Sequence, residues 1–69
     1  MLDIVYTNIK NRRLELGMTQ DMLAEKMGYK DRSTIAKIET GKVDITLKQL
    51  RKLADALDTT QMKLLGWER

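Results

Sequence analysis

Three glycines divide this sequence into short segments whose apolar residues recur at helical spacing. Gly17, Gly28 and Gly41 each follow such a segment, and glycine readily ends a helix because it adopts the left-handed conformation that the chain needs there. The chain has 69 residues and no proline, so it offers one small core and short helices. We therefore expect an all-α domain over residues 1–65, with residues 66–69 as a C-terminal tail or the start of a linker.

Five helices are predicted from the apolar spacing and from the residues that can cap them. The first three span about residues 2–16, 20–27 and 32–40. Thr19 and Asp31 precede the second and third, and such side chains accept hydrogen bonds from the free N–H groups of a first helical turn. The side chains expected to face inward from these helices are Val5, Ile9, Leu16, Leu23, Ala24, Met27, Ile35 and Ile38.

The clearest helix start lies at Thr46. Thr46 and Gln49 have the spacing of a capping box, in which the hydroxyl and the amide each bind a backbone N–H group that the helix leaves free. Thr60 can cap a last turn or two. The side chains expected to face inward from the fourth helix are Leu47, Leu50, Leu53, Ala54 and Leu57.

Positive charge is concentrated in the middle of the sequence. The whole chain carries +3 at pH 7. Residues 26–52 hold eight Lys and Arg against three Asp and Glu, which is a net charge of +5, and each flank carries −1. A central basic segment favours a polyanionic partner.

The residue types that are missing exclude most enzyme mechanisms. The sequence has no His and no Cys, so it lacks the commonest general base and the thiolate ligands of structural zinc sites. It also has no glycine-rich phosphate loop of the nucleotide-binding kind. We expect no enzyme activity, no cofactor, no metal site and no small-molecule ligand.

The sequence also indicates where the protein is found. No apolar run approaches the ~18 residues of a membrane-spanning helix. The first residues, Met1 to Ile4, lack the basic start and the apolar stretch of a signal peptide. We therefore expect a cytoplasmic protein without membrane contact.

Several motifs occur in an order that is typical of one family. The segments Thr19–Gly28 and Arg32–Lys42 follow Ile9–Arg13 and precede Leu53–Leu57. Over about residues 9–65 they resemble the lambda repressor/Cro-like (xenobiotic-response-element) helix-turn-helix regulators, in particular the N-terminal domains of phage-type repressors. The resemblance implies a five-helix fold whose second and third helices form the helix-turn-helix, with the third helix in the major groove of DNA.

The resemblance also implies roles for particular residues. Arg13 and Glu39 match a structural ion pair between the first and third helices. Base reading is implied for the outward side chains of the third helix, which are Arg32, Ser33, Ala36 and Lys37. Phosphate contacts are implied for Gln20, Thr34, Thr40 and Lys42.

Two positions depart from the family pattern. Gly28 and Ile35 are seven positions apart, one more than the family usually has, so residues 29–31 should form a longer turn. Asp58 stands where the family commonly has Gly. Aspartate tolerates the left-handed conformation, so the fold should accommodate it.

The implied function is that of a sequence-specific, double-stranded DNA-binding transcriptional regulator, a repressor of phage or bacterial type, associated with the nucleoid. One short helix in one groove rarely discriminates enough by itself, so we expect a homodimer on an inverted-repeat operator. A last turn or two of helix cannot bury all of its apolar side chains. The predicted dimer contact is therefore Met62, Leu64, Leu65 and Trp67.

An alternative from another class is an antitoxin-like or other protein-interaction module on the same fold. Salt distinguishes the two, because DNA affinity falls steeply as the salt concentration rises. A protein interface is more apolar and therefore less sensitive to salt.

Overall fold

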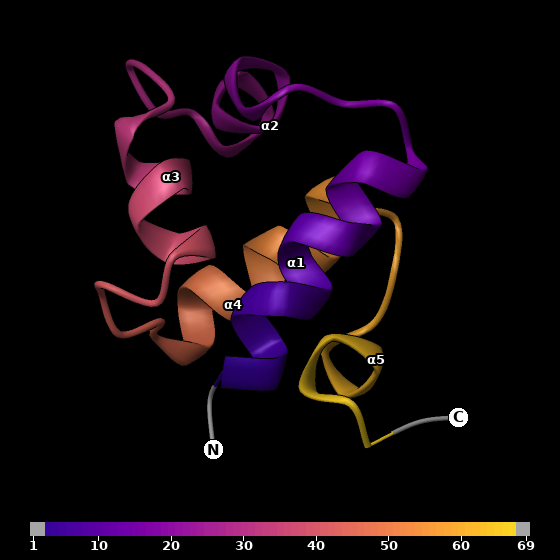
Figure 1. The fold of residues 1–69 in the computed structure, drawn as a ribbon. Coiled ribbons are helices and arrows are strands. Elements are labelled where there is room, and N and C mark those ends of the chain that lie inside the picture. The colour runs from indigo at the N-terminus through magenta and orange to yellow at the C-terminus, as the bar shows by residue number, and fades with distance from the viewer. Residues whose placement is uncertain (1–2, 68–69) are drawn as a thin grey trace.

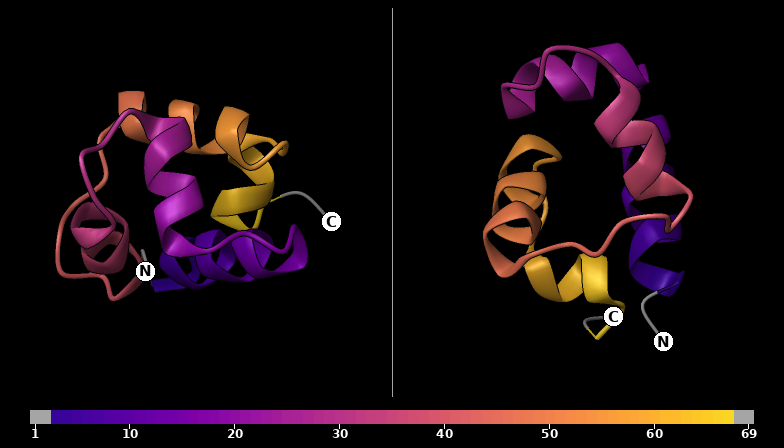
Figure 2. Two further views of the ribbon diagram at one scale, coloured as in Figure 1. Left: turned by 90° about the horizontal axis from the view of Figure 1, so that it is seen from above. Right: turned by 90° about the vertical axis from the view of Figure 1, so that its left-hand side faces the viewer.

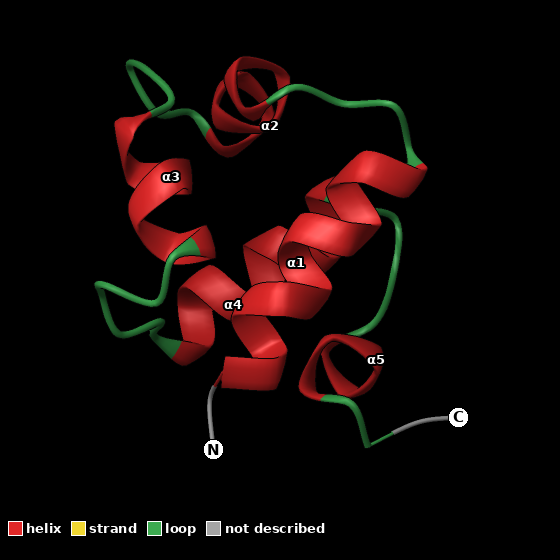
Figure 3. Ribbon diagram, viewed as in Figure 1, coloured by secondary structure: helices red, strands yellow, loops and turns green. Residues whose placement is uncertain are grey.

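The helices follow one another with short connections. The computed structural model describes residues 3–67, and within that range it contains five helices and no strand (Figure 3). The all-α prediction is thus confirmed. The helices are α1 (Asp3–Glu15), α2 (Gln20–Met27), α3 (Ser33–Glu39), α4 (Leu47–Ala56) and α5 (Gln61–Leu65).

The helix boundaries agree closely with those predicted. α2 has the predicted bounds, whereas α3 is one residue shorter at each end than the predicted range 32–40. α1 ends at Glu15 rather than residue 16, and the predicted start at Leu2 lies outside the described residues. Within residues 3–67, no helix is long and apolar enough to cross a membrane.

The helices surround one core and leave α3 and α5 at opposite ends of the molecule (Figures 1 and 2). α1 and α4 lie on opposite sides when the molecule is seen from above, and α2 crosses between them (Figure 2, left). α1 contacts both α3 and α5, and α2 contacts α3 and α4. A surface formed by α3 is therefore separated from one formed by α5.

All three predicted threonine caps are present, at the starts of α2, α4 and α5. The Thr19 hydroxyl oxygen accepts a hydrogen bond from the Met22 backbone N–H at 3.1 Å. At α4, Thr46 Oγ1 accepts from the Gln49 N–H at 3.1 Å, and Gln49 Oε1 accepts from the Thr46 N–H at 3.0 Å. Each bond satisfies a donor that the helix geometry leaves free.

The core forms where the inward faces of the helices meet. Two predicted core residues are wrong: Leu16 is 40% exposed because α1 ends before it, and Leu47 is 81% exposed. Met18, which follows the turn at the end of α1, is buried. In α4 the first buried residue is Leu50. The largest fully buried side chains are Ile9, Leu23, Ile35, Ile38, Leu53, Leu57 and Leu64.

Gly41 lies in the connection between α3 and α4, at the point where this connection packs against Tyr6 of α1. Its φ is +72°, and a Cβ atom there would lie 3.0 Å from the aromatic ring of Tyr6. The Tyr6 hydroxyl donates a hydrogen bond to the Val43 backbone oxygen at 3.1 Å. Gly41 is therefore required both for the left-handed backbone and for the close approach of the ring.

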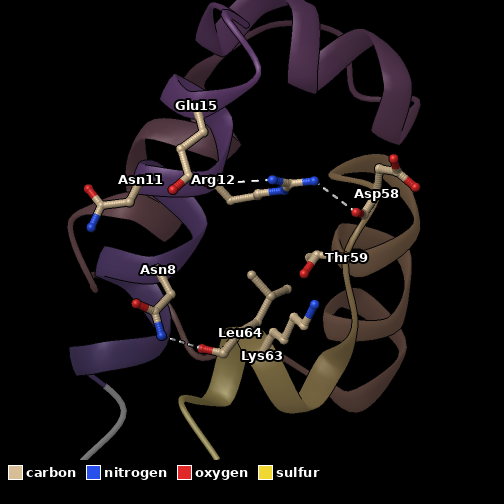
Figure 4. A pocket seen from close by; sticks show the side chains of 8 residues that line it. All are labelled: Asn8, Asn11, Arg12, Glu15, Asp58, Thr59, Lys63 and Leu64. Atoms are coloured by element: carbon tan, nitrogen blue, oxygen red, sulfur yellow. Dashed lines mark hydrogen bonds and ion pairs between the residues drawn. The ribbon is translucent and has the colours of Figure 1, made fainter. Parts of the chain in front are cut away.

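Two polar side chains of α1 hold α5 and the segment that leads into it (Figure 4). Arg12 donates from Nε to the Leu57 backbone oxygen and from Nη2 to the Asp58 backbone oxygen, both at 2.9 Å. Asn8 Nδ2 donates to the Leu64 backbone oxygen at 2.9 Å. Asp58 adopts φ +51°, which is the left-handed conformation expected at this position.

Candidate nucleic-acid interface

The helix-turn-helix consists of α2, the turn at residues 28–32 and α3. Gly28 ends α2 with φ +78°. Tyr29 is half-buried against the core, and its hydroxyl accepts a hydrogen bond from Gln49 Nε2 at 3.5 Å. Ile35 and Ile38 are both fully buried, so the additional residue in the turn does not change which face of α3 packs inward.

Asp31 stabilises the first turn of α3. Its Oδ1 accepts a hydrogen bond from the Ser33 backbone N–H at 2.8 Å, while Arg32 occupies the N-cap position without a capping side chain. Hydrogen bonds from the backbone and side chain of Ser33 lower the pKa of the Asp31 carboxyl, and the charge of Lys37 acts in the same direction. The predicted cap at Asp31 is thus one residue before the observed N-cap, because α3 begins at Ser33 rather than at Arg32, but the carboxylate still accepts the first helical N–H.

The outward face of α3 lies at the edge of the molecule (Figure 1). Arg32, Ser33 and Lys37 are exposed, and Thr34 and Ala36 are half-buried. Of the four side chains expected to read bases, Arg32 thus lies at the N-cap, and Ser33, Ala36 and Lys37 lie on the first two turns of α3, away from its buried isoleucines. Within residues 3–67, Lys37 forms no ion pair, so its ammonium group is available to an external acceptor.

Arg32 does have a charged neighbour, which no pattern in the sequence indicates. Its Nη1 lies 3.9 Å from Asp21 Oδ2 in the first turn of α2. Both side chains are two-thirds exposed. The residues are eleven positions apart and lie on different helices, so no helical spacing rule indicates this pair.

A buried ion pair joins α1 to the end of α3, at the two residues that the resemblance implied. Arg13 donates from Nε to Glu39 Oε2 at 2.7 Å and from Nη2 to Oε1 at 3.0 Å. Arg13 Nη1 also donates to the Met18 backbone oxygen at 2.7 Å. The Glu39 side chain is 2% exposed, so both charges are largely removed from water and satisfied by each other.

Gln20 belongs to the same network. Its Nε2 donates a hydrogen bond to Glu39 Oε1 at 3.2 Å, so one side-chain N–H of the glutamine holds it against α3. An amide nitrogen carries two hydrogens. The second N–H remains for an external acceptor at the start of α2.

Thr40 and Lys42 lie just beyond α3. The Thr40 hydroxyl donates to the backbone oxygens of Ala36 at 3.0 Å and Lys37 at 3.1 Å, so the threonine can offer an external group its lone pairs rather than its proton. Lys42 is exposed. Among the described residues, Lys42 forms no ion pair.

The C-terminal segment divides between the core and the surface. Met62 and Trp67 are 50% and 73% exposed, and Leu65 is half-buried. Leu64 is 2% exposed, so its assignment to a dimer contact is wrong, since α5 packs this side chain into the core beneath Arg12 (Figure 4). α5, which carries Met62 and Leu65, lies at the opposite end of the molecule from α3 (Figure 1).

The surface around α3 offers hydrogen-bond donors rather than a reaction centre. It carries guanidinium, ammonium, hydroxyl and amide groups on a convex helix. Among residues 3–67, no group of three or more metal-ligating side chains could hold a metal ion. Such a surface can donate to acceptors that are spread along an extended polyanion.

The comparisons with known proteins agree with this arrangement. A family model described as helix-turn-helix matches residues 9–61. The solved structure of hypothetical transcription factor NHTF from Neisseria is similar, with a TM-score of 0.84 and 30% identity over 94% of this chain and 75% of that one. None of the curated proteins matches the chain.

Two restriction-modification controller proteins are also similar. For C.AhdI from Aeromonas hydrophila, the TM-score is 0.83 and the identity 32%, over 91% of this chain and 90% of that one. For wild-type C.Esp1396I, the TM-score is 0.82 and the identity 35%, over 94% of this chain and 83% of that one.

Proposed function

Because the chain belongs to the lambda repressor/Cro-like helix-turn-helix family of DNA-binding transcriptional regulators, we propose that it represses transcription from an inverted-repeat operator. In this proposal α3 lies in the major groove of double-stranded DNA, and two copies bind the two half-sites. The observation that carries the proposal is the outward face of α3. Arg32 and Lys37 are exposed there while Ile35 and Ile38 fix the helix on the core.

Arg32 and Lys37 are the side chains that we assign to base edges. Both can donate to O6 and N7 of guanine, which is the commonest specific contact in the major groove. Ser33 and Ala36 lie beside them on the same face and would contact neighbouring bases. Gln20, Thr34 and Lys42 would contact phosphates on either side of the groove and so set the position of α3. Thr40 would join them by turning its hydroxyl proton from the backbone oxygens of Ala36 and Lys37 to a phosphate oxygen.

Selection of bound sequences from a random duplex pool tests the proposed function directly. We expect the selected sequences to converge on an inverted repeat, with half-sites about one helical turn apart, because two-fold protein symmetry is matched by the DNA. Repression is then measured with a reporter gene that carries the selected sequence in its promoter. Failure of the pool to converge would contradict sequence-specific binding.

Lys42→Ala should weaken binding to every duplex by a similar factor. A phosphate contact carries no sequence information, and its loss should reduce the slope of log affinity against log salt concentration by about one. Affinities for the selected operator and for a scrambled duplex, each measured at several salt concentrations, check this. Gln20→Ala should likewise leave the sequence preference unchanged.

Lys63→Ala is the matched control for Lys42→Ala. Lys63 is an exposed lysine on α5, at the other end of the molecule from α3 (Figure 1). We expect it to leave the salt slope unchanged. If Lys42→Ala instead changes the preferred sequence, then Lys42 contacts a base, and the assigned position of α3 in the groove is wrong.

Self-association through the C-terminal segment is expected to depend on Met62 and Trp67. Both are exposed in the single domain, so a charge there should not disturb the core. The double variant Met62→Glu/Trp67→Glu should raise the dimer dissociation constant at least about tenfold, which corresponds to ~1.4 kcal/mol. Sedimentation equilibrium over a range of concentrations, with and without operator DNA, measures this.

Met22→Glu serves as the control, because Met22 is also 50% exposed but lies on α2. It should leave the dimer dissociation constant unchanged. A double variant that associates as tightly as the unmodified protein would place the dimer contact elsewhere.

A further inference from the structure

The ion pair between Asp21 and Arg32 connects the two helices of the helix-turn-helix at the point where α3 begins. The contact joins Asp21 Oδ2 and Arg32 Nη1 at 3.9 Å. Asp21 lies in the first turn of α2, directly after Gln20, and Arg32 is the N-cap residue of α3. A carboxylate on one helix thus faces the first side chain that we assign to base reading on the other.

Within residues 3–67, Arg32 forms its ion pair with Asp21. The neighbouring carboxylate of Asp31 is occupied by the backbone N–H of Ser33. A guanidinium group has five N–H donors in a rigid plane. Contact at Nη1 leaves Nε and Nη2 to form the two parallel hydrogen bonds that guanine accepts.

The position of Asp21 should be unfavourable for general DNA binding. Gln20, its neighbour, is assigned to a phosphate, so the Asp21 carboxylate would face the polyanionic backbone at close range. Like charges repel there, and the repulsion acts on every duplex irrespective of sequence. A carboxylate that served only as surface charge would therefore lower specific and non-specific affinity together.

We propose that Asp21 is a positioning residue that holds the Arg32 guanidinium for base reading and thereby raises the sequence selectivity of the domain. This inference rests on the proposed function, in which α3 reads base edges. An unrestrained arginine side chain samples many rotamers and loses that freedom on binding a base. The ion pair restricts the side chain beforehand, so less freedom is lost when the correct base is bound.

The inference predicts that one variant changes the affinities for two kinds of DNA by different factors. Asp21→Ala should raise affinity for a scrambled duplex, because a repelling charge is removed. It should also lower the ratio of operator affinity to scrambled-duplex affinity about twofold to fivefold, the range expected for an exposed ion pair. Fluorescence anisotropy with the two labelled duplexes at one salt concentration measures both quantities.

Glu25→Ala is the matched control. Glu25 is an exposed carboxylate one turn later on α2, and it forms no ion pair among the described residues. It should raise the affinity for both duplexes by the same factor and leave their ratio unchanged. Asp21→Glu keeps a carboxylate within reach of Arg32 and should restore most of the ratio.

A second background tests whether Asp21 acts through Arg32. In an Arg32→Ala protein, Asp21→Ala should no longer alter the ratio, because the guanidinium that it holds is missing. The inference is overturned if Asp21→Ala leaves the ratio unchanged, or if its effect persists without Arg32. If Arg32→Ala alone leaves selectivity unchanged, then the base-reading role of Arg32 fails, and this inference fails with it.

Discussion

Glu39→Ala is expected to destabilise the domain by about 3 to 5 kcal/mol, the cost of leaving one partner of a buried ion pair without its counter-charge. The Arg13 guanidinium is held by Glu39 at 2.7 Å and 3.0 Å. In the variant the guanidinium would stay buried, and its remaining hydrogen bond would be to the Met18 backbone oxygen. For a domain of this size, the melting temperature should fall by at least ~12 °C, as measured by circular dichroism.

Glu15→Ala is the control for this stability prediction. Glu15 pairs with Arg12 at 3.3 Å, but its side chain is 66% exposed, so its removal should cost less than ~1 kcal/mol. Loss of DNA binding by Glu39→Ala should follow from loss of structure, because Glu39 also holds Gln20. A Glu39→Ala protein that melts at the wild-type temperature and no longer binds DNA would show that Glu39 supports DNA binding by holding Gln20, or by its own contact, rather than through stability.

Lys37→Ala and Arg32→Ala are expected to lower operator affinity more than affinity for a scrambled duplex. A good bidentate contact to a base contributes roughly 1 to 3 kcal/mol of discrimination. This corresponds to about a 5-fold to 150-fold change in the affinity ratio. Anisotropy titrations of both duplexes with each variant measure the ratio.

The control for base reading is Lys10→Ala, since Lys10 is an exposed lysine on α1. It removes the same charge without touching α3, so the affinity ratio should stay at the wild-type value. Equal losses on the two duplexes for both Lys37→Ala and Arg32→Ala would remove these side chains from the base-reading face. Phosphate contacts at α3 would then explain the loss.

The helices could be predicted from the sequence because their start signals are local. Thr19 and Thr46 bind backbone N–H groups three residues further along the chain, so each cap and its partner lie in one short segment. The longer turn after Gly28 was also visible as a spacing. The buried isoleucines of α3 follow from their spacing of three positions, which places them on one face of any helix.

The two wrong core predictions, Leu16 and Leu47, show where helical spacing no longer predicts burial. Leu16 has the spacing of an inward residue but lies past the end of α1, where the helical rotation no longer applies. Leu47 is the first residue of α4 and lies beyond the edge of the core. A helical pattern says which way a residue points but not where the neighbouring helices stop.

Part of the candidate site could also be predicted from the sequence, because helical spacing says which way a side chain points. The outward residues of α3 follow from the inward ones, and the Arg13–Glu39 pair was implied by the family resemblance. The hydrogen bond from Gln20 to Glu39 and the Asp21–Arg32 contact had no signal in the sequence. Each joins residues on different helices, and the crossing of α2 over α3 decides whether they meet.

The sequence by itself thus determined the bounds of α2, the starts of α4 and α5, which face of α3 is apolar, and where positive charge accumulates. These properties depend on interactions within about four residues along the chain. Only the tertiary structure decided that Leu64 belongs to the core, that Gly41 must make room for Tyr6, and which carboxylate lies beside Arg32. Those outcomes depend on how the helices pack against one another, and many residues distant in the sequence set that packing together.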